Sequence, residues 1–462
     1  MSILATSTAS AGAVAELAAA VTGPVLTADH PGLAAEVATF NLAVTHRPVV
    51  VVGATSAEDV STAVCWAAGH GLPVAVQATG HGPVQPVTDA VLITTGRMTS
   101  VRVDPEGRTA TVGAGTRWHD VLAAAEPHGL AGVCGSSTQV GVVGFCVGGG
   151  MGPLSRQFGF GADLVRRMEA VTADGRIRSI DEHHDPELFW AMRGGKGNFG
   201  IVTSLELDLV PVARIYGGTV FFSAVSARDV LHSFRAWAPT LPDHASASIA
   251  LLQLPPLEAL PEPIRGRYVV QLRFSVNGSE AEGVELLAPM LAAGEILLSG
   301  VGELPMTAID AIHQDPRDPI PVWERGALLG ALPSEAVERL LDVAGPDSGS
   351  SLAMVELRLM GGALRREPRV PNAVSGRGGA YSLLTLGVLA PGLEDLVPRS
   401  GAGVHDALTP WSTDTVPVNW LGDATTPEQV ARAWHQDVHA RLLQVKHEVD
   451  PANLFRFGHA LV

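Results

Sequence analysis

Short apolar runs alternate with amphipathic stretches along the first eighty residues. Residues 48–52 form one apolar run, and Val74 and Val76 belong to a second run of β-branched side chains. Between the runs, Ser56 and Asp59 have the spacing of a capping box, and apolar positions then recur at helical intervals. The pattern predicts strand–helix–strand, preceded by a weakly specified lead-in over residues 1–45.

Five further strands and two helices are predicted up to residue 210. Asp174-Gly175 is a turn signal that predicts a hairpin. Asp185 before Pro186 predicts a helix with Asp185 as its N-cap. The predicted strands cover residues 90–94, 109–112, 168–172, 176–180 and 201–210, and the other helix carries Trp118, Val121, Leu122 and Ala125 on one face and ends at Gly129.

The pattern changes after about residue 214, where strand-like runs alternate with helical patterns and proline-rich connectors. This texture is typical of an α+β domain built on a mostly antiparallel sheet. The predicted strands are residues 218–222, 248–252, 268–274, 354–360 and 381–388. Near the end, Thr426 opens one predicted helix, with an apolar face formed by Val430, Trp434, Val438, Leu442 and Val445.

Composition narrows the class of protein. A chain of 462 residues predicts about two to three domains. With 46% hydrophobic and 17% charged residues it has the composition of a well-packed enzyme. The net charge of −16, with scattered lysines and arginines, leaves no basic face for nucleic acid or for an anionic membrane.

The expected location is the cytoplasm. The N-terminus is alanine-rich but lacks the basic start of a secretory signal, and no apolar stretch is long enough to span a membrane. Three cysteines, Cys65, Cys134 and Cys146, fit a reducing compartment. Cys65 falls within a helical pattern and is expected to be buried. No spacing of His, Cys, Asp or Glu predicts a metal site.

Two glycine-dense segments are candidates for binding chemistry. The first presents His81 between Gly80 and Gly82, directly after a predicted strand, where the backbone can approach a ligand closely. The second covers residues 135–152 and supplies main-chain N–H groups of the kind that contact phosphates. A histidine in such a loop is more often structural than chemical. The loop by itself leaves both interpretations open.

A third glycine pattern is rejected as a nucleotide motif. Gly195, Gly197 and Gly200 match G-x-G-x-x-G. A dinucleotide-binding motif needs a strand before it and a helix after it, whereas here a helix precedes and a strand follows. The sequence therefore does not predict a nicotinamide-binding Rossmann domain.

Eight stretches in a fixed order carry a resemblance to a known family. They are ATGHG at 78–82, VGAGTRWHDV at 112–121, PHGLAGVCGSSTQVGVVGFCVGGGMGPLSRQFG at 127–159, VTADGR at 171–176, DPELFWAMRGGKGNFGIVT at 185–203, MGGAL at 360–364, VNWLGD at 418–423 and VKHEVDPANLFRF at 445–457. With these the sequence resembles the FAD-linked oxidases of the berberine bridge enzyme-like group, of bacterial type, in the superfamily of vanillyl-alcohol oxidase and p-cresol methylhydroxylase. The stretches are dense in the N-terminal part and sparse in the middle.

The resemblance implies an α+β fold in three segments. Residues 1–212, with a core of about 44–212, would form a two-subdomain FAD-binding domain. Residues 213–410 would form a substrate-binding domain with an antiparallel sheet covered by helices. Residues 411–462 would return to the FAD-binding domain.

The resemblance also implies the cofactor site. His81 matches the histidine that members bond covalently to FAD, and the two glycine-dense segments would hold the pyrophosphate and ribityl chain. Many relatives have arginine where this chain has Gln77, which removes one charge partner of the phosphates. The implied cofactor residues are Gln77, Ala78, Thr79, Gly80, His81, Gly82, Ser136, Ser137, Thr138, Val140, Gly141, Gly144, Gly197, Asn198, Gly200, Ile201, Val202, Asn453 and Phe455.

A second covalent link is not expected. A subset of relatives attach the flavin a second time through cysteine, at the position that is Ser137 here, while Cys134 lies three residues upstream. A thiolate needs activation and access. A packed Cys134 is the favoured interpretation, and a link from Cys134 stays open as the alternative.

The catalytic residues are less clearly implied. The family's tyrosine-containing motif near the C-terminus reads Pro417-Val418-Asn419-Trp420 here, so Asn419 and Trp420 are expected to shape the pocket. Tyr381 is the expected source of a tyrosinate base. Glu356 and Arg358 lie on one face of a strand and would serve as base and anchor, or as a plain ion pair.

The expected function is a flavin oxidase. A hydride would move from a small, mostly neutral organic substrate (an alcohol, sugar, amine or secondary-metabolite intermediate) to FAD, and O2 would reoxidise the flavin to give H2O2. The alternatives are a dehydrogenase with another electron acceptor and a non-redox flavoprotein or cyclase of secondary metabolism. The expected partners are the substrate and O2, without nucleic acid or membrane, and a homodimer is an allowed assembly.

Overall fold

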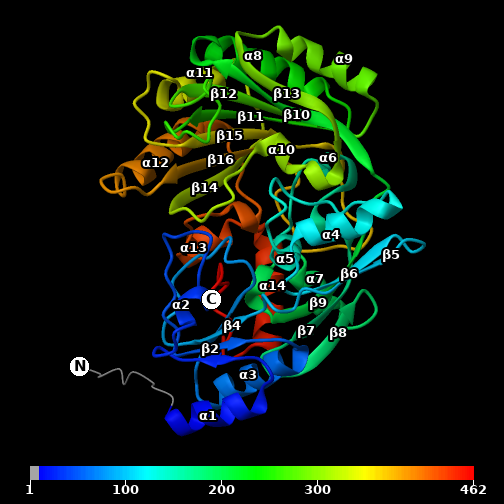
Figure 1. Ribbon diagram of the computed structural model, residues 1–462, viewed down its shortest axis with the longest axis vertical. Coiled ribbons are helices and arrows are strands. Elements are labelled where there is room, and N and C mark those ends of the chain that lie inside the picture. Colours follow the sequence, from blue (N-terminus) through cyan, green and yellow to red (C-terminus); the bar gives the residue numbers. More distant parts are fainter. Residues whose placement is uncertain (1–9) are drawn as a thin grey trace.

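The computed structural model describes residues 10–462 and contains three sheets (Figure 1). The first has the strand order β1-β2-β4-β3, in which β2, β4 and β3 are parallel and β1 is antiparallel. Helix α3 packs on it through Val60, Ala63, Val64 and Ala67. The elements are β1 (Val25–Leu26), β2 (Val50–Gly53), α3 (Ala57–Gly69), β3 (Val74–Gln77) and β4 (Val91–Thr94).

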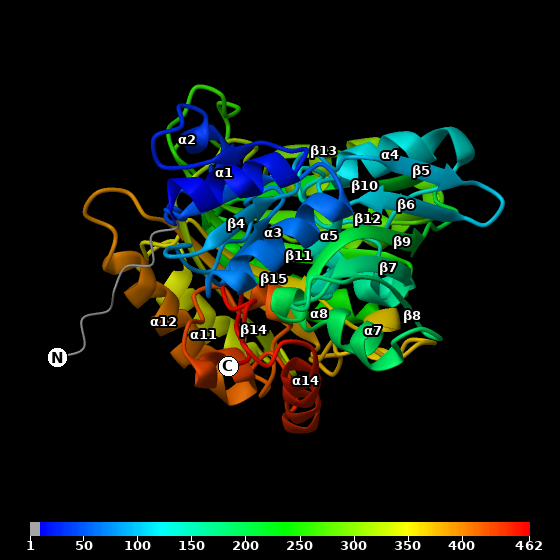
Figure 2. The ribbon, with the colours of Figure 1, turned by 90° about the horizontal axis from the view of Figure 1, so that it is seen from below.

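The lead-in before this sheet is more ordered than its sequence indicated. It contains α1 (Ala11–Ala20), β1 and α2 (Leu33–Glu36). The reason is a long-range contact: the Asp59 carboxylate accepts the N–H groups of Thr22 and Gly23 at 2.7 and 3.1 Å. A contact with a residue almost forty positions away has no local sequence signal. Figure 1 shows α1 and α3 at the end of the molecule opposite the largest sheet, and in Figure 2, seen from below, they lie in front of it.

The second sheet has the order β5-β6-β9-β7-β8 and is antiparallel throughout. The predicted hairpin and helix face are present here. Asp185 does precede a helix, but its φ is +53° and its side chain makes no cap bond, so the expected capping chemistry was wrong. The elements are β5 (Val101–Asp104), β6 (Thr109–Gly113), α4 (Trp118–Ala125), α5 (Val142–Val147), α6 (Ser155–Phe158), β7 (Val165–Val171), β8 (Ile177–Asp181), α7 (Pro186–Met192) and β9 (Ile201–Asp208).

The third sheet has seven antiparallel strands in the order β13-β10-β12-β11-β15-β16-β14. Helices cover its outer face, at the top of Figure 1. Its strands are β10 (Arg214–Ser223), β11 (Ala245–Gln253), β12 (Tyr268–Val276), β13 (Ile296–Pro305), β14 (Val322–Leu329), β15 (Met354–Leu359) and β16 (Tyr381–Val388). The covering helices are α8 (Ala227–Trp237), α9 (Glu280–Leu291), α11 (Ser334–Ala344) and α12 (Leu396–Leu408), whereas α10 (Asp310–His313) lies on the inner face.

The alternation of side chains gives this sheet two different faces. Residues such as Leu272 and Leu357 join the apolar core beneath the covering helices. Their strand neighbours Arg273, Glu356 and Arg358 therefore lie on the opposite face, because successive side chains of a strand point to opposite sides. That inner face is polar and lies against the glycine-rich segment.

The C-terminal part runs back to the first sheet. One continuous helix was predicted here, but the structure has α13 (Pro427–Ala431) and α14 (Gln436–Val449). The chain leaves the helical conformation at His435, whose ψ is 151°, and the neighbouring Trp434 indole N–H donates to Gly194 O at 3.0 Å. After α14, Val74 of β3 donates its N–H to Leu454 O at 2.9 Å and pairs with Phe455. No helix between residues 10 and 462 is long and apolar enough to cross a membrane.

Candidate functional site

His81 follows β3 in a loop whose backbone is tightly held. Gly80 has a φ of +63°, and a Cβ there would come within 2.8 Å of Thr39 Cα, so glycine is required. The Phe40 N–H donates to Gly80 O at 2.7 Å, and the Phe40 and His81 ring centroids are 4.3 Å apart. Burial lowers the pKa of His81. The imidazole is therefore neutral at physiological pH and retains a nitrogen lone pair.

The glycine-rich segment lies directly against this loop. A Cβ on Gly141 would stand 3.4 Å from Thr79 Cγ2. Beside it, the backbone N–H and the hydroxyl of Thr138 donate to the Asp310 carboxylate at 2.7 and 2.8 Å. The structure thus brings together the two glycine-dense segments singled out in the sequence.

The residues around Asn198 are joined to the C-terminus. The Asn198 side-chain amide donates to His459 O at 3.0 Å and accepts the Leu461 N–H at 3.2 Å. The buried Lys446 ammonium donates to Asn198 O and Phe455 O, each at 2.8 Å. The Asn198 side chain is thus occupied by contacts within the protein. The backbone of the neighbouring Gly197 is open to a ligand.

Several of the expected cofactor residues border open space. A Cβ added at Gly82, Gly144 or Gly197 would meet no atom within 4 Å. Val76 exposes 44% of its surface although its neighbours in β3 are buried. Of the expected cofactor residues, the exposed or half-buried ones are Ala78, Thr79, His81, Gly82, Ser136, Val140, Gly144, Gly197 and Asn453, and the buried ones are Gln77, Gly80, Ser137, Thr138, Gly141, Asn198, Gly200, Ile201, Val202 and Phe455.

A cavity lies between the glycine-rich segment and the inner face of the seven-stranded sheet. Residues 151–153 line one side, and the Ser275 hydroxyl reaches Pro153 O at 3.5 Å. Arg273, His313 and Arg358 line the other side.

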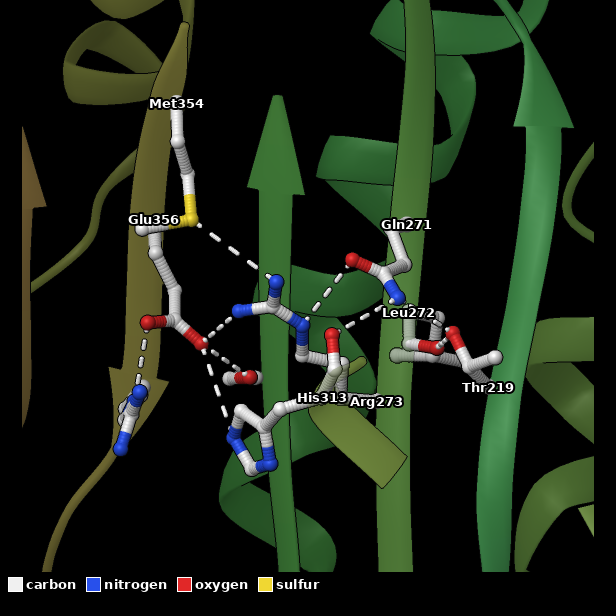
Figure 3. Close-up of polar contacts among 9 residues, drawn as sticks. Thr219, Gln271, Leu272, Arg273, His313, Met354 and Glu356 are labelled. Atoms are coloured by element: carbon white, nitrogen blue, oxygen red, sulfur yellow. Dashed lines mark hydrogen bonds and ion pairs between the residues drawn. The ribbon is translucent and has the colours of Figure 1, made fainter. Parts of the chain in front are cut away.

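Glu356 and the two arginines form a buried ion cluster (Figure 3), and Arg273 and Arg358 of this cluster line the cavity. Glu356 is fully buried and accepts from Arg273 Nη1 at 2.5 Å, Arg358 Nε at 2.9 Å and Ser248 Oγ at 2.7 Å. Burial opposes the charge, yet Arg358 and Arg273 hold the pKa of Glu356 well below its usual range. The carboxylate is ionised and already has partners at both oxygens.

Comparisons with known proteins agree with this geometry. The family model described as FAD binding domain matches residues 48–181, and the model described as berberine and berberine like matches residues 418–461. The chain is 28% identical over 442 residues to (R)-6-hydroxynicotine oxidase of Paenarthrobacter nicotinovorans, covering 89% of this chain and 91% of that protein. The two domain matches and this relative support a berberine bridge enzyme-like FAD-linked oxidase.

Solved structures share the fold over almost the whole chain. The 6-hydroxy-D-nicotine oxidase of Arthrobacter nicotinovorans has a TM-score of 0.81 at 24% identity, covering 96% of this chain and 98% of that chain. The BBE-like 1 protein of Physcomitrella patens has a TM-score of 0.83 at 18% identity, covering 97% and 99%. The predicted α+β fold of a berberine bridge enzyme-like oxidase is therefore confirmed, and the protein is an FAD-dependent enzyme.

The loops of this berberine bridge enzyme-like oxidase fit an extended cofactor. There is space for a ligand beside the main chain at Gly82, Gly144 and Gly197, and the Val76 side chain is exposed. His81 lies in the same region, since Thr79 touches Gly141. The residues present therefore fit FAD.

Tyr381 does not face the cavity, contrary to the sequence-based expectation. Its side chain belongs to the core under the helices, where its ring lies 6.2 Å from that of Phe234. Burial raises the pKa of Tyr381 to about 12. The register of β16 explains this position, because Ser382 and Leu384 take the inner face. Tyr381 is thus not placed to accept a proton from a substrate in the cavity.

Glu356, Asn419 and Trp420, the other expected catalytic or pocket residues, have defined contacts on the inner side of the sheet or beside α5. Glu356 is too strongly paired to be an effective base, so the plain ion pair is the better interpretation. The Arg358 guanidinium lies 5.0 Å over the Trp420 ring. Asn419 Nδ2 donates to Phe145 O at 3.0 Å and so joins the C-terminal part to helix α5.

A second group of titratable residues was missed in the sequence. Lys196 Nζ lies 3.3 Å from His459 Nδ1, and burial lowers the pKa of Lys196 to about 8. Burial raises the pKa of Glu324, against the attraction of Lys196. Lys196 has a φ of +58°, and its place among the glycines of GGKGNFG was the available signal.

The cysteines differ in part from expectation. Cys134 is buried, and burial raises the pKa of its thiol to about 12, which fits a packed residue rather than a nucleophile. Cys65 was expected to be buried but is exposed, because it lies on the outer side of α3. Among residues 10–462 no cluster of His, Cys, Asp and Glu could hold a metal ion.

Proposed function

We propose that the enzyme holds FAD covalently through His81 and oxidises a small organic molecule bound in the cavity above the ion cluster. The supporting observation is the contact between the His81 loop and the glycine-rich segment, whose other end lines that cavity. When bound, FAD would supply a two-electron acceptor for a hydride from carbon. O2 would reoxidise the reduced flavin and would itself be reduced to H2O2.

His81 is suited to covalent attachment. Its ring is neutral because burial lowers its pKa, and a neutral imidazole nitrogen is the nucleophile that such a bond requires. The Phe40 ring and the left-handed turn at Gly80 hold the loop in place. Attachment through His81 alone is proposed, since the Cys134 thiol is buried and protonated.

The substrate is proposed to be a small alcohol, sugar, amine or secondary-metabolite intermediate. The relatives of similar fold include a xylooligosaccharide oxidase from Myceliophthora thermophila with xylobiose, at 21% identity and a TM-score of 0.82. The cavity is lined by both apolar and polar side chains, as pockets for small organic molecules are. A location in the cytoplasm and a homodimer remain part of the proposal.

The deciding experiment is denaturing electrophoresis with flavin fluorescence, together with intact mass. Wild type is expected to carry one FAD through denaturation, His81→Ala none, and the exposed control His183→Ala the wild-type amount. A residual adduct in His81→Ala would implicate Cys134 instead. Absence of flavin from all three proteins would contradict the cofactor assignment. If the wild type does hold flavin, O2 consumption during turnover separates an oxidase from a dehydrogenase.

A further inference from the structure

The inner face of the seven-stranded sheet carries more positive than negative charge. Arg273 and Arg358 share the single carboxylate of Glu356, and their side chains are only 4% and 11% exposed. Among the residues the structure describes, neither guanidinium has a second carboxylate at ion-pair distance. A buried guanidinium without a full partner is costly unless an anion completes its shell.

Two sets of polar atoms on this face have no partner. No hydrogen bond within residues 10–462 involves the Nη atoms of Arg358, whose Nε alone reaches Glu356. His313 is 6% exposed, and its Nδ1 is buried without a hydrogen-bond partner. Both residues line the cavity. Buried polar groups in native structures are nearly always satisfied, so His313 Nδ1 indicates a missing ligand, and the Nη atoms of Arg358 in the same cavity are available to donate to it.

We propose that Arg358 and His313 bind the carboxylate group of the substrate. The unused Nη atoms of Arg358 offer a planar pair of donors that matches a carboxylate. A neutral His313 can carry its proton on Nδ1 and donate it to the same group. This proposal rests on the proposed function, because it takes the cavity as the substrate site.

The rest of the cavity suits the body of an organic acid. Met151, Ile312 and Leu364 present apolar side chains to it. The substrate class is thus a carboxylate on a small aromatic or aliphatic body. The net charge of −16 led us to expect a neutral molecule, but the charge of this face is opposite to that of the whole chain.

Arg156 adds to the positive surroundings without taking part in binding. Its Nε donates to Met360 O at 3.0 Å, and its other nitrogens donate to backbone carbonyls of residues 241–245. Its geometry is therefore fixed by the backbone. Its charge still favours an anion in the cavity that it lines.

The test compares three acids with their neutral amides on the purified flavoprotein. The probes are benzoate, phenylacetate and 3-phenylpropionate against benzamide, phenylacetamide and 3-phenylpropanamide, with binding measured by calorimetry and by change in flavin absorbance. At least one acid is expected to bind about tenfold or more tightly than its amide. Equal binding of every pair, or no saturable binding of any acid, would overturn the proposal.

Variants then locate the preference. Arg358→Met is expected to abolish the preference for the acid while amide binding changes less than about twofold, and Arg399→Met, at an exposed site on α12, is the matched control. His313→Phe is expected to weaken acid binding alone. A preference that survives in both cavity variants contradicts the assignment. If Arg358→Met does not fold, the wild-type comparison and His313→Phe still decide.

Failure of the carboxylate site is distinguishable from failure of the proposed function. Flavin content and O2 consumption report on the function, whereas calorimetry reports acid preference whether or not FAD is present. An enzyme that holds flavin but binds acids and amides equally would retain the function and lose this inference.

Discussion

A single glycine shows how closely the C-terminal part meets the flavin-binding core. A Cβ at Gly148 would collide with the Asn419 amide, which is itself held by its bond to Phe145 O. Asn419 thus acts as a tie between η9 (Val418–Trp420) and α5. Its role was expected in the pocket wall, and the structure adds this structural contact.

Gly148→Ala is expected to destabilise the protein by about 1–3 kcal/mol, because the added methyl forces Asn419 or the backbone to move. The measurement is the free energy of unfolding in urea. Gly69→Ala is the control, since a Cβ there meets no atom within 4 Å and the residue ends helix α3. Equal stability of both variants would contradict the predicted collision.

At the scale of elements, the turn after α14 is organised by one buried carboxylate. Asp450 accepts Lys446 Nζ at 2.6 Å and the N–H groups of Leu454 and Phe455 at 2.7 and 2.9 Å. Lys446 and Asp450 are almost entirely inaccessible to solvent. The pair therefore fixes the segment that lies beside β3.

Asp450→Asn is expected to lower the free energy of unfolding by about 3–5 kcal/mol, since it leaves the Lys446 ammonium buried without its counter-charge. Urea unfolding measures the loss, and the exposed Glu448→Gln on the same helix is expected to change it by less than about 0.5 kcal/mol. A double variant with Lys446→Met should lose less than the sum of the two single changes. Additive losses would show that the two side chains act independently.

The central strands of the large sheet were easier to predict from the sequence than its edge strands. The sequence predicted β15 and β16 closely, but β13 and β14 were missed. These are the edge strands of the large sheet, and β14 contains the charged pair Glu324 and Arg325 in its middle. Such strands lack the unbroken apolar run of a central strand.

At the scale of the whole molecule, several histidines are buried in neutral form. Burial lowers the pKa of His405 to about 4, and that of His313 and His459 to about 3. The ordinary value is near 6.5, so the unfolded chain binds protons between these limits while the folded protein does not. Stability from these groups is complete above about pH 6.5 and is lost as the pH falls toward 4.

Stability is therefore expected to fall steeply on acidification, by up to about 1.4 kcal/mol per pH unit for each such histidine. Urea unfolding at several pH values between about 7.5 and 5 measures the slope. His405→Gln, remote from the cavity and bonded to Thr385, should reduce the slope by about one proton. The exposed His183→Gln should leave it unchanged. A slope that His405→Gln does not alter would show that His405 is not neutral in the fold.

The sequence by itself determined the family, the main strands and the two glycine-dense segments. These depend on local pattern: glycine where φ is positive at Gly80, β-branched runs in β3 and β4, and a histidine between glycines. Their order along the chain was sufficient to predict the cofactor class.

Only the tertiary structure decided which side chains share the cavity. Tyr381 and Glu356 have similar sequence contexts, yet register places one under the helices and the other on the inner face. His313 comes from a segment with no pattern of its own, and the glycine-rich stretch around Lys196 does not indicate its contacts. Both residues become significant through partners more than forty residues away. Charge balance and burial depend on such distant contacts, so no local pattern in the chain could reveal them.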